Sequence, residues 1–256
     1  MSFVLLNLIY TLLLLIGMLG MLEVGRRIGL RRMAEDKEGA RTGIGTVEGA
    51  ILALLGLLIA FSFSGAATRF DQRRQQIVDE ASKISSAYAL IDLLPAEDQA
   101  PLRETFKLYV DSRLEAYRKI PDLAAAKVEL ERSKALQNEI WTRAVDATGD
   151  PEAALLVLPA IGQVINISTQ RTAALYTHPP AIIFVMLGGL MLIGSLLAGY
   201  GMASARSRNW VHTVAFAVTL ALTFYVIRDL EYPRLPGLVG MGNFDNVLVD
   251  LRESMR

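Results

Sequence analysis

The sequence predicts an all-α membrane protein: four transmembrane helices, with a helical soluble domain inserted between spans two and three. Two observations lead to this fold class. Four long apolar windows carry charges only at their ends, and the segment 68–180 between the second and third windows is polar and rich in helix signals. The windows are Phe3–Leu22, Val47–Ala67, Ala181–Ala203 and Val211–Ile227.

The windows have the length that a bilayer requires. Crossing about 30 Å of hydrocarbon takes roughly 20 apolar residues in a helix. The first three windows reach that length and the fourth is marginal. Four such windows in one chain favour membrane spans over four buried helices of a soluble protein. The lipid bilayer is therefore the first expected partner, and the chain should be a multi-pass membrane protein.

The spans divide the chain into four regions. Residues 1–67 hold the first two spans and a basic short loop, 23–46, and residues 68–180 form the helical soluble domain that continues from span two. Residues 181–227 hold the last two spans, and residues 228–256 form a tail with a short amphipathic helix. We expect that helix to pack on the soluble domain rather than lie on the membrane, because its polar face mixes charges of both signs.

Capping residues mark helices inside the soluble domain. Asp122 is expected to cap the helix that follows it, and Asp150 is an N-cap followed by Pro151 at the first helical position. Pro159 should break or kink the helix that begins at Pro151, because an interior proline removes a backbone donor.

One helix is expected to continue out of the membrane. Small or apolar residues repeat every 3.5 residues from span two into the polar region, which predicts a single helix from Thr46 to Leu93, ended by Leu94–Pro95. In the membrane half, the stripe consists of small residues that let helices approach closely. Its partner is either a helix of the same chain or a symmetry copy. The helix-packing stripe contains Gly49, Gly56, Ala60 and Ala67.

Composition excludes several classes of function. The chain has 26 basic and 26 acidic residues and no cysteine, so neither nucleic-acid binding by net charge nor thiol chemistry is expected. No metalloprotease, P-loop or serine-hydrolase motif is present, so we expect no enzyme, no catalytic residue, no metal and no cofactor. The spans carry no ionisable residue between their ends, which argues against a proton-coupled transporter and leaves a passive channel open.

Charges near the span ends bear on orientation and on ion attraction. The loop 23–46 and the hairpin with Arg206 and Arg208 are basic, which favours their placement in the cytoplasm and the termini and middle domain outside. Arg69, Arg73 and Arg74 follow span two. They either concentrate anions at one mouth of a pore or snorkel at the membrane surface.

The chain resembles the bestrophin-like domain family, bacterial and plant membrane proteins, and is more distantly similar to the bestrophin anion channels. The resemblance lies in Thr68–Arg69–Phe70, Arg73–Arg74, Glu80 and the tail residues Asp229, Pro233 and Gly237. It implies a pentamer of four-span subunits in which span two lines a hydrophobic neck just before the Thr-Arg-aromatic sequence. That alignment gives Ala53, Leu57 and Phe61 as neck candidates. As ordinary apolar residues, they would instead face lipid or pack against another helix.

The chain also departs from the bestrophins. Phe70 and Asp71 replace a tryptophan pair, and the acidic tail motif survives only as "LEYPRLPG". The bestrophin orientation places the middle domain in the cytoplasm, opposite to the loop charges. We expect an oligomeric channel, pentameric or tetrameric, in a bacterial inner membrane, with inorganic anions as the first ions to test. The alternative is a non-conducting membrane sensor or scaffold that acts through its helical domain.

Overall fold

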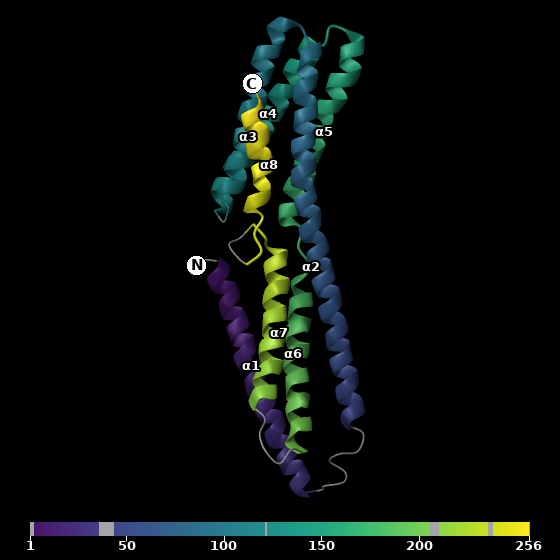
Figure 1. Cartoon of the computed structure of the whole chain (residues 1–256), viewed down its shortest axis with the longest axis vertical. Coiled ribbons are helices and arrows are strands. Elements are labelled where there is room, and N and C mark those ends of the chain that lie inside the picture. The colour runs from purple at the N-terminus through teal and green to yellow at the C-terminus, as the bar shows by residue number, and fades with distance from the viewer. Residues whose placement is uncertain (1–2, 36–43, 121, 205–209, 235–237, 256) are drawn as a thin grey trace. The chain divides into compact units, whose positions relative to one another are not determined.

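The structure, a computed structural model, describes residues 3–35, 44–120, 122–204, 210–234 and 238–255. All regular structure in these residues is helical, which confirms the all-α prediction (Figure 1). The α-helices are α1 (Phe3–Glu35), α2 (Ile44–Ala89), α3 (Ala96–Arg118), α4 (Leu123–Ala147), α5 (Pro151–Tyr176), α6 (Ala181–Gly201), α7 (Trp210–Glu231) and α8 (Asn246–Ser254). Short 3-10 turns are η2 (Leu90–Leu93), η3 (Met202–Ser204) and η4 (Gly242–Asp245).

The chain divides into two compact units. Unit 1 comprises residues 1–69, 178–232 and 236–239, and unit 2 comprises residues 70–177, 233–235 and 240–256. Helix α2 belongs to both, because it continues without a break from one unit into the other. The four predicted spans are confirmed as helical segments long and apolar enough to cross a membrane, with α1, α2, α6 and α7 as their helices.

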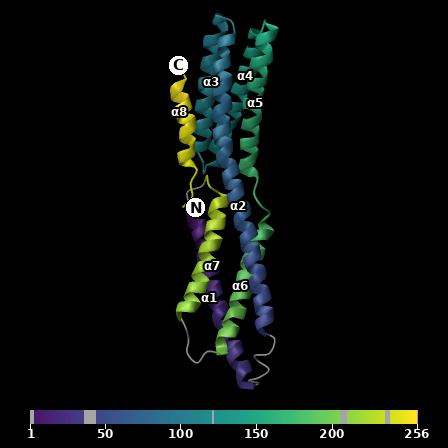
Figure 2. The same ribbon diagram turned by 45° about the vertical axis from the view of Figure 1, so that its right-hand side comes forward.

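Glycines set the packing of unit 1, where α1 lies along α6 and also contacts α7 (Figure 2). A Cβ atom on Gly25 would lie 1.9 Å from the carbonyl oxygen of Leu196, and one on Gly199 would lie 2.1 Å from that of Leu22. Only glycine permits backbones to meet this closely, as expected for spans that associate in lipid.

Helix α1 is longer than the first apolar window. It continues to Glu35, so the described first part of the basic segment 23–46 is helical rather than a loop. Gly25 and Gly29 do not end the helix because both lie against the backbone of α6 and serve as contact points. Lys37 and Arg41 of this segment, and Arg206 and Arg208 of the later hairpin, lie outside the described residues.

The helix predicted from Thr46 to Leu93 is confirmed. Helix α2 runs from Ile44 to Ala89, tightens into the 3-10 turn Leu90–Leu93 and ends at Leu94, whose backbone is extended before Pro95. An extended residue before proline is the expected stop, because the proline ring crowds the helical conformation of its predecessor.

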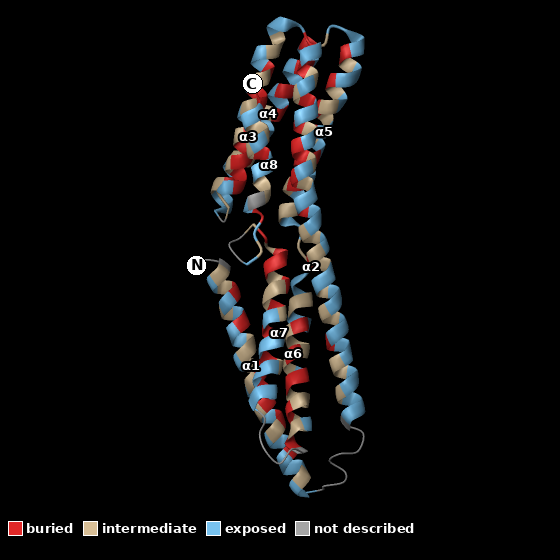
Figure 3. Ribbon diagram, in the orientation of Figure 1, coloured by how far each residue is buried: buried red, intermediate tan, exposed pale blue. Residues whose placement is uncertain are grey.

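Unit 2 is a bundle of the second half of α2 with α3, α4, α5 and α8. Its apolar core includes Ile77, Ile84, Phe106 and Ile161, all at most 1% exposed. The predicted caps are confirmed: Asp122 accepts bonds from two backbone N–H groups of α4, and Asp150 accepts one from α5. Figure 3 shows the buried residues concentrated along the facing sides of these helices.

Two further expectations concern this unit. The tail helix is α8, and its Leu248 is fully buried in the core of unit 2, so packing is confirmed over a membrane-surface position. Pro159 was expected to break or kink its helix. The break is wrong, because α5 continues through the proline from Pro151 to Tyr176, and the kink stays a prediction. Val157 and Ile161 are buried on either side of the proline, and we attribute the continuity to that packing.

Candidate functional site: the second span and the charges that follow it

The neck candidates lie on the outer face of α2. Leu57 is 52% exposed and Phe61 is 68% exposed, and Ala53 is exposed one turn earlier. The spacing of four residues places all three on one side of the helix. In a single chain, this face is free to meet lipid, another subunit or a pore.

The small-residue stripe of the membrane half also faces outward. Gly49, Gly56 and Ala60 are exposed, and Ala67 is half-buried. A Cβ atom added to Gly49 or Gly56 would meet no atom of the described residues within 4 Å. The buried positions of this half are instead Leu55 and Ala66. At Gly49 and Gly56 the stripe therefore makes no close contact with the described part of its own chain.

The same stripe changes partner further along α2. In the second half of the helix, Ile77, Ala81, Ile84 and Ile91 are buried in the core of unit 2. One continuous 3.5-residue repeat thus has two kinds of environment. The larger apolar residues pack within the chain, whereas Gly49, Gly56 and Ala60 of the membrane half are exposed.

Arg69 is paired with a buried carboxylate at the end of α7. Its Nε and Nη2 atoms lie 2.9 Å from the same oxygen of Glu231, whose side chain is fully buried. The Nδ1 atom of His178 lies 3.4 Å from the other carboxylate oxygen, and its ring stacks on Tyr232. The charge of Arg69 is therefore balanced within unit 1.

Arg73 and Arg74 have different surroundings in unit 2. Arg73 is buried and donates hydrogen bonds to the carbonyl oxygens of Ala174 and Thr177, at 3.3 and 2.8 Å. These carbonyls belong to the C-terminal end of α5, where the last carbonyl groups of a helix have no N–H donor within the helix. Arg74 is 48% exposed and lies 3.4 Å from Asp71. It is the most exposed of the three arginines, and hence the one best placed to act on ions in solution.

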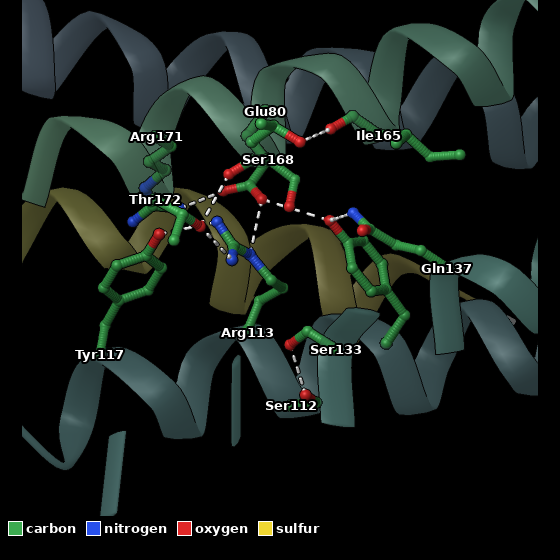
Figure 4. Close-up of polar contacts among 12 residues, drawn as sticks. Glu80, Ser112, Arg113, Tyr117, Ser133, Gln137, Ile165, Ser168, Arg171 and Thr172 are labelled. Carbon is green, nitrogen blue, oxygen red and sulfur yellow. Dashed lines mark hydrogen bonds and ion pairs between the residues drawn. The ribbon is translucent and has the colours of Figure 1, made fainter. Parts of the chain in front are cut away.

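A buried ion cluster lies in unit 2, and its centre is Glu80. One carboxylate oxygen of Glu80 accepts a 2.7 Å bond from Nε of Arg113 and the other accepts a bond from Arg171. The three side chains are 0%, 1% and 4% exposed, respectively. Figure 4 shows the carboxylate lying between the two guanidinium groups. Because the charges are buried, their pairing matters more than that of a surface salt bridge.

The cluster fixes the protonation states of its members. Burial alone would raise the pKa of Glu80, which lies outside the apolar window of α2, but Arg113 and Arg171 together hold this pKa below its ordinary value. Burial opposes the charge of Arg113 most strongly, but Glu80 together with Tyr117 and Tyr109 outweighs burial and raises the pKa of that guanidinium. The hydroxyl oxygen of Tyr109 lies 3.3 Å from a carboxylate oxygen of Glu80. Burial, which is the larger cause, and the charge of Glu80 both raise the pKa of this hydroxyl. The cluster is therefore fully ionised and the tyrosine neutral near pH 7.

Sequence reasoning singled out Glu80 only through the family resemblance and missed Arg113 and Arg171. A local signal was present. Arg113 falls on the apolar face of α3, seven residues after Phe106, and Arg171 falls seven residues after Val164 on α5. A charged residue at a core position of an amphipathic helix predicts a buried partner of opposite charge.

No metal site was found in the described ranges, where three or more His, Cys, Asp or Glu residues do not meet in a suitable group. The site therefore consists of an outward-facing apolar helix in unit 1 and fixed charges at its continuation. The apolar face of α2 and the charges that follow it are therefore the features of the described residues on which a function can be based.

These features define the class: a multi-span helical membrane protein with a helical unit continuous with its second span. The chain belongs to the bestrophin-like family, whose domain model matches residues 12–233. A search of curated proteins found no significant match.

The fold is also that of solved structures. Two crystal structures, each of a bacterial bestrophin homologue from Klebsiella pneumoniae with a point mutation, are similar to this chain. The first has a TM-score of 0.72 at 11% identity and covers 94% of this chain and 98% of the homologue. The second has a TM-score of 0.67 at 11% identity, with 94% and 97% covered. At this identity the likeness establishes the fold.

Proposed function

We propose that this protein is a homo-oligomeric ion channel in which α2 of each subunit lines the pore. The observation that carries the proposal is the membrane half of α2, which turns Ala53, Leu57 and Phe61 and the small-residue stripe away from its own chain. Glycines that meet nothing within 4 Å would let a neighbouring helix approach closely. Family membership and the bestrophin fold support the same arrangement.

In this proposal, a ring of Phe61 and Leu57 side chains narrows the pore. A hydrophobic constriction stops ions by excluding water, so no ionisable residue is needed inside the span. Anions are the first ions to test, since the family resemblance implies them. Arg74, exposed beyond the span, is the arginine through which the pore mouth would attract them.

We further propose that residues 70–177 of unit 2 lie in water as a domain inserted between spans two and three of a bacterial inner-membrane protein. Their apolar side chains form a core, while the outer faces of α3 and α4 are rich in charged residues. The side of the membrane can be assigned directly, because the chain has no native cysteine. An impermeant thiol reagent added to intact cells should modify Lys134→Cys if the unit is extracytoplasmic and should not modify it if the bestrophin orientation holds.

The first test is subunit count by native mass spectrometry of the detergent-purified protein. A tetramer or pentamer is expected. Liposome flux with chloride and nitrate then compares Phe61→Ala with Ile16→Ala, which removes a comparably exposed side chain (64%) from α1. Phe61→Ala should increase the flux and Ile16→Ala should leave it unchanged. Equal flux from both variants would count against Phe61 as a pore residue.

The second candidate function is a non-conducting sensor or scaffold. The observation that favours it is the continuity of α2, because an unbroken helix can carry a movement from the membrane into unit 2. A monomer or dimer in the same native mass spectrum would rule out a channel formed by a ring of subunits and would support this second candidate. Capture of partners by unit 2 would then be the next experiment.

A further inference from the structure

The buried charged residues of unit 2 form a group that reaches from Glu80 to the tail, and the ring of Tyr117 lies among them. Three guanidinium groups surround Tyr117: the Cζ atoms of Arg171, Arg234 and Arg113 lie 3.9, 4.5 and 5.1 Å from the ring centroid. Each distance is within the range of a cation–π contact. The three arginines come from α5, the tail and α3, so the fold concentrates positive charge at one point of unit 2.

The cluster contains more positive than negative charge. Among the described residues, its three arginines face two carboxylates, Glu80 and Asp245. The side chains of Arg113, Arg171 and Arg234 are 1%, 4% and 12% exposed, respectively, so water screens their charges little. An excess buried cation is costly unless an anion is near. The charge balance therefore favours the binding of anions at the part of the cluster nearest to solvent.

Asp245 already occupies that part. One of its oxygens lies 3.0 Å from Nη2 of Arg171 and 2.9 Å from Nη2 of Arg234, and the other oxygen accepts a bond from Nη1 of Arg234. A phosphate, sulfate or free carboxylate binds to arginine forks with this same geometry. Asp245 is 19% exposed, so its position is reachable from solvent.

We propose that Arg171 and Arg234, with Arg113 behind them, form a binding site for a small oxyanion, and that Asp245 fills this site as a tethered carboxylate which a free oxyanion can replace. Asp245 directly precedes α8, so replacement would release the link between the tail and the helical bundle at this point. The site lies within unit 2, and the inference does not depend on ion conduction.

Because Asp245 is part of the same chain, it determines how tightly a free oxyanion can bind at this site. A carboxylate held on the same chain competes at an effective concentration of about millimolar or more, so the wild-type protein should bind a free oxyanion weakly. Removal of the Asp245 carboxylate leaves three guanidinium groups with one carboxylate. The variant Asp245→Ala should therefore bind phosphate at least about tenfold more tightly than the wild type does.

The test is thermal unfolding of the full-length protein in detergent, with titration by sodium phosphate or sodium chloride at equal ionic strength. Asp245→Ala should melt below the wild type in chloride and recover in phosphate with a saturable dose response. Arg234→Gln in the Asp245→Ala background should abolish the recovery. The matched control is Asp111→Ala, which removes the partly exposed partner of Arg252 from another ion pair of the tail. Phosphate stabilises proteins generally by exclusion from their surface, and that effect would raise the control equally.

Equal melting of Asp245→Ala in phosphate and chloride, or a phosphate response no larger than that of Asp111→Ala, would overturn the site. If Asp245→Ala does not fold, Asp245→Asn keeps the shape of the side chain and removes its charge. Wild-type and Arg234→Gln proteins can also be compared by phosphorus NMR line broadening, which should appear only with Arg234 present. Nanodiscs of phosphatidic acid without free phosphate distinguish a lipid headgroup from a soluble ion as the source of the oxyanion.

Discussion

Removal of the negative charge of Glu80 should destabilise the protein severely. The carboxylate is fully buried and balances two guanidinium groups that are 1% and 4% exposed. In Glu80→Gln, Arg113 and Arg171 keep their charges but lose the carboxylate between them. Breaking a buried ion pair on one side typically costs about 3–5 kcal/mol, because the remaining charge is left without a partner.

Thermal unfolding in detergent measures this cost. About 4 kcal/mol corresponds to a decrease in melting temperature of roughly 8–16 °C for a chain of this size. The control is Glu139→Gln, whose carboxylate is 45% exposed and is paired on the surface with Arg143. Its expected effect is below about 1 kcal/mol. A decrease for Glu80→Gln no larger than that of the control would refute the reasoning that the cluster is buried and ionised.

Three further predictions follow from the same structure. Gly25→Ala should lower the melting temperature by several degrees because its Cβ atom would meet the backbone of α6, whereas Gly56→Ala should leave the subunit fold unchanged, since its Cβ atom meets nothing within 4 Å of its own chain. Arg69→Gln should cost roughly 2–4 kcal/mol, measured by the same melting assay, because Glu231 would stay buried without its guanidinium; an unchanged melting temperature would contradict this pairing. Acid should weaken the protein through Glu80: its pKa is lower in the folded state, so its contribution is complete above the ordinary glutamate value of 4.5 and is lost as the pH falls further. A pH series should therefore show less acid sensitivity in Glu80→Gln than in the wild type.

Hydropathy and helical period were sufficient to predict the spans and the course of α2. An apolar window and a 3.5-residue repeat depend only on the local sequence, and both carried through to Ala89 and the 3-10 turn after it. The end of α1 was not predicted. The basic residues Arg26 and Arg27 favoured a loop, whereas Gly25 packs against α6 and the helix continues. That contact is made by a residue far along the chain, so no local pattern contains it.

The buried charges show the same limit. Arg113 and Arg171 break the apolar face of their helices, which indicates burial, but their partner Glu80 is 33 and 91 positions away. A single sequence can indicate that a buried arginine requires a carboxylate partner, but it does not show which carboxylate that is. The neck candidates Ala53, Leu57 and Phe61 and the anion-attracting arginines stay predictions, because they concern a pore and its ions, which a single chain does not form.

The bonds from Arg73 to the end of α5 have a mechanical consequence. Arg73 follows closely after residue 70, where the chain enters unit 2 along α2, and Thr177 is the residue after which it leaves. One side chain thus ties the entry point to the exit point across more than a hundred positions of sequence. Two of the points at which the chain passes between the units, after residue 69 and after residue 177, are thus bridged within unit 2. Within unit 2, the start and the end of the segment 70–177 are therefore held together, and neither can shift along the bundle without the other.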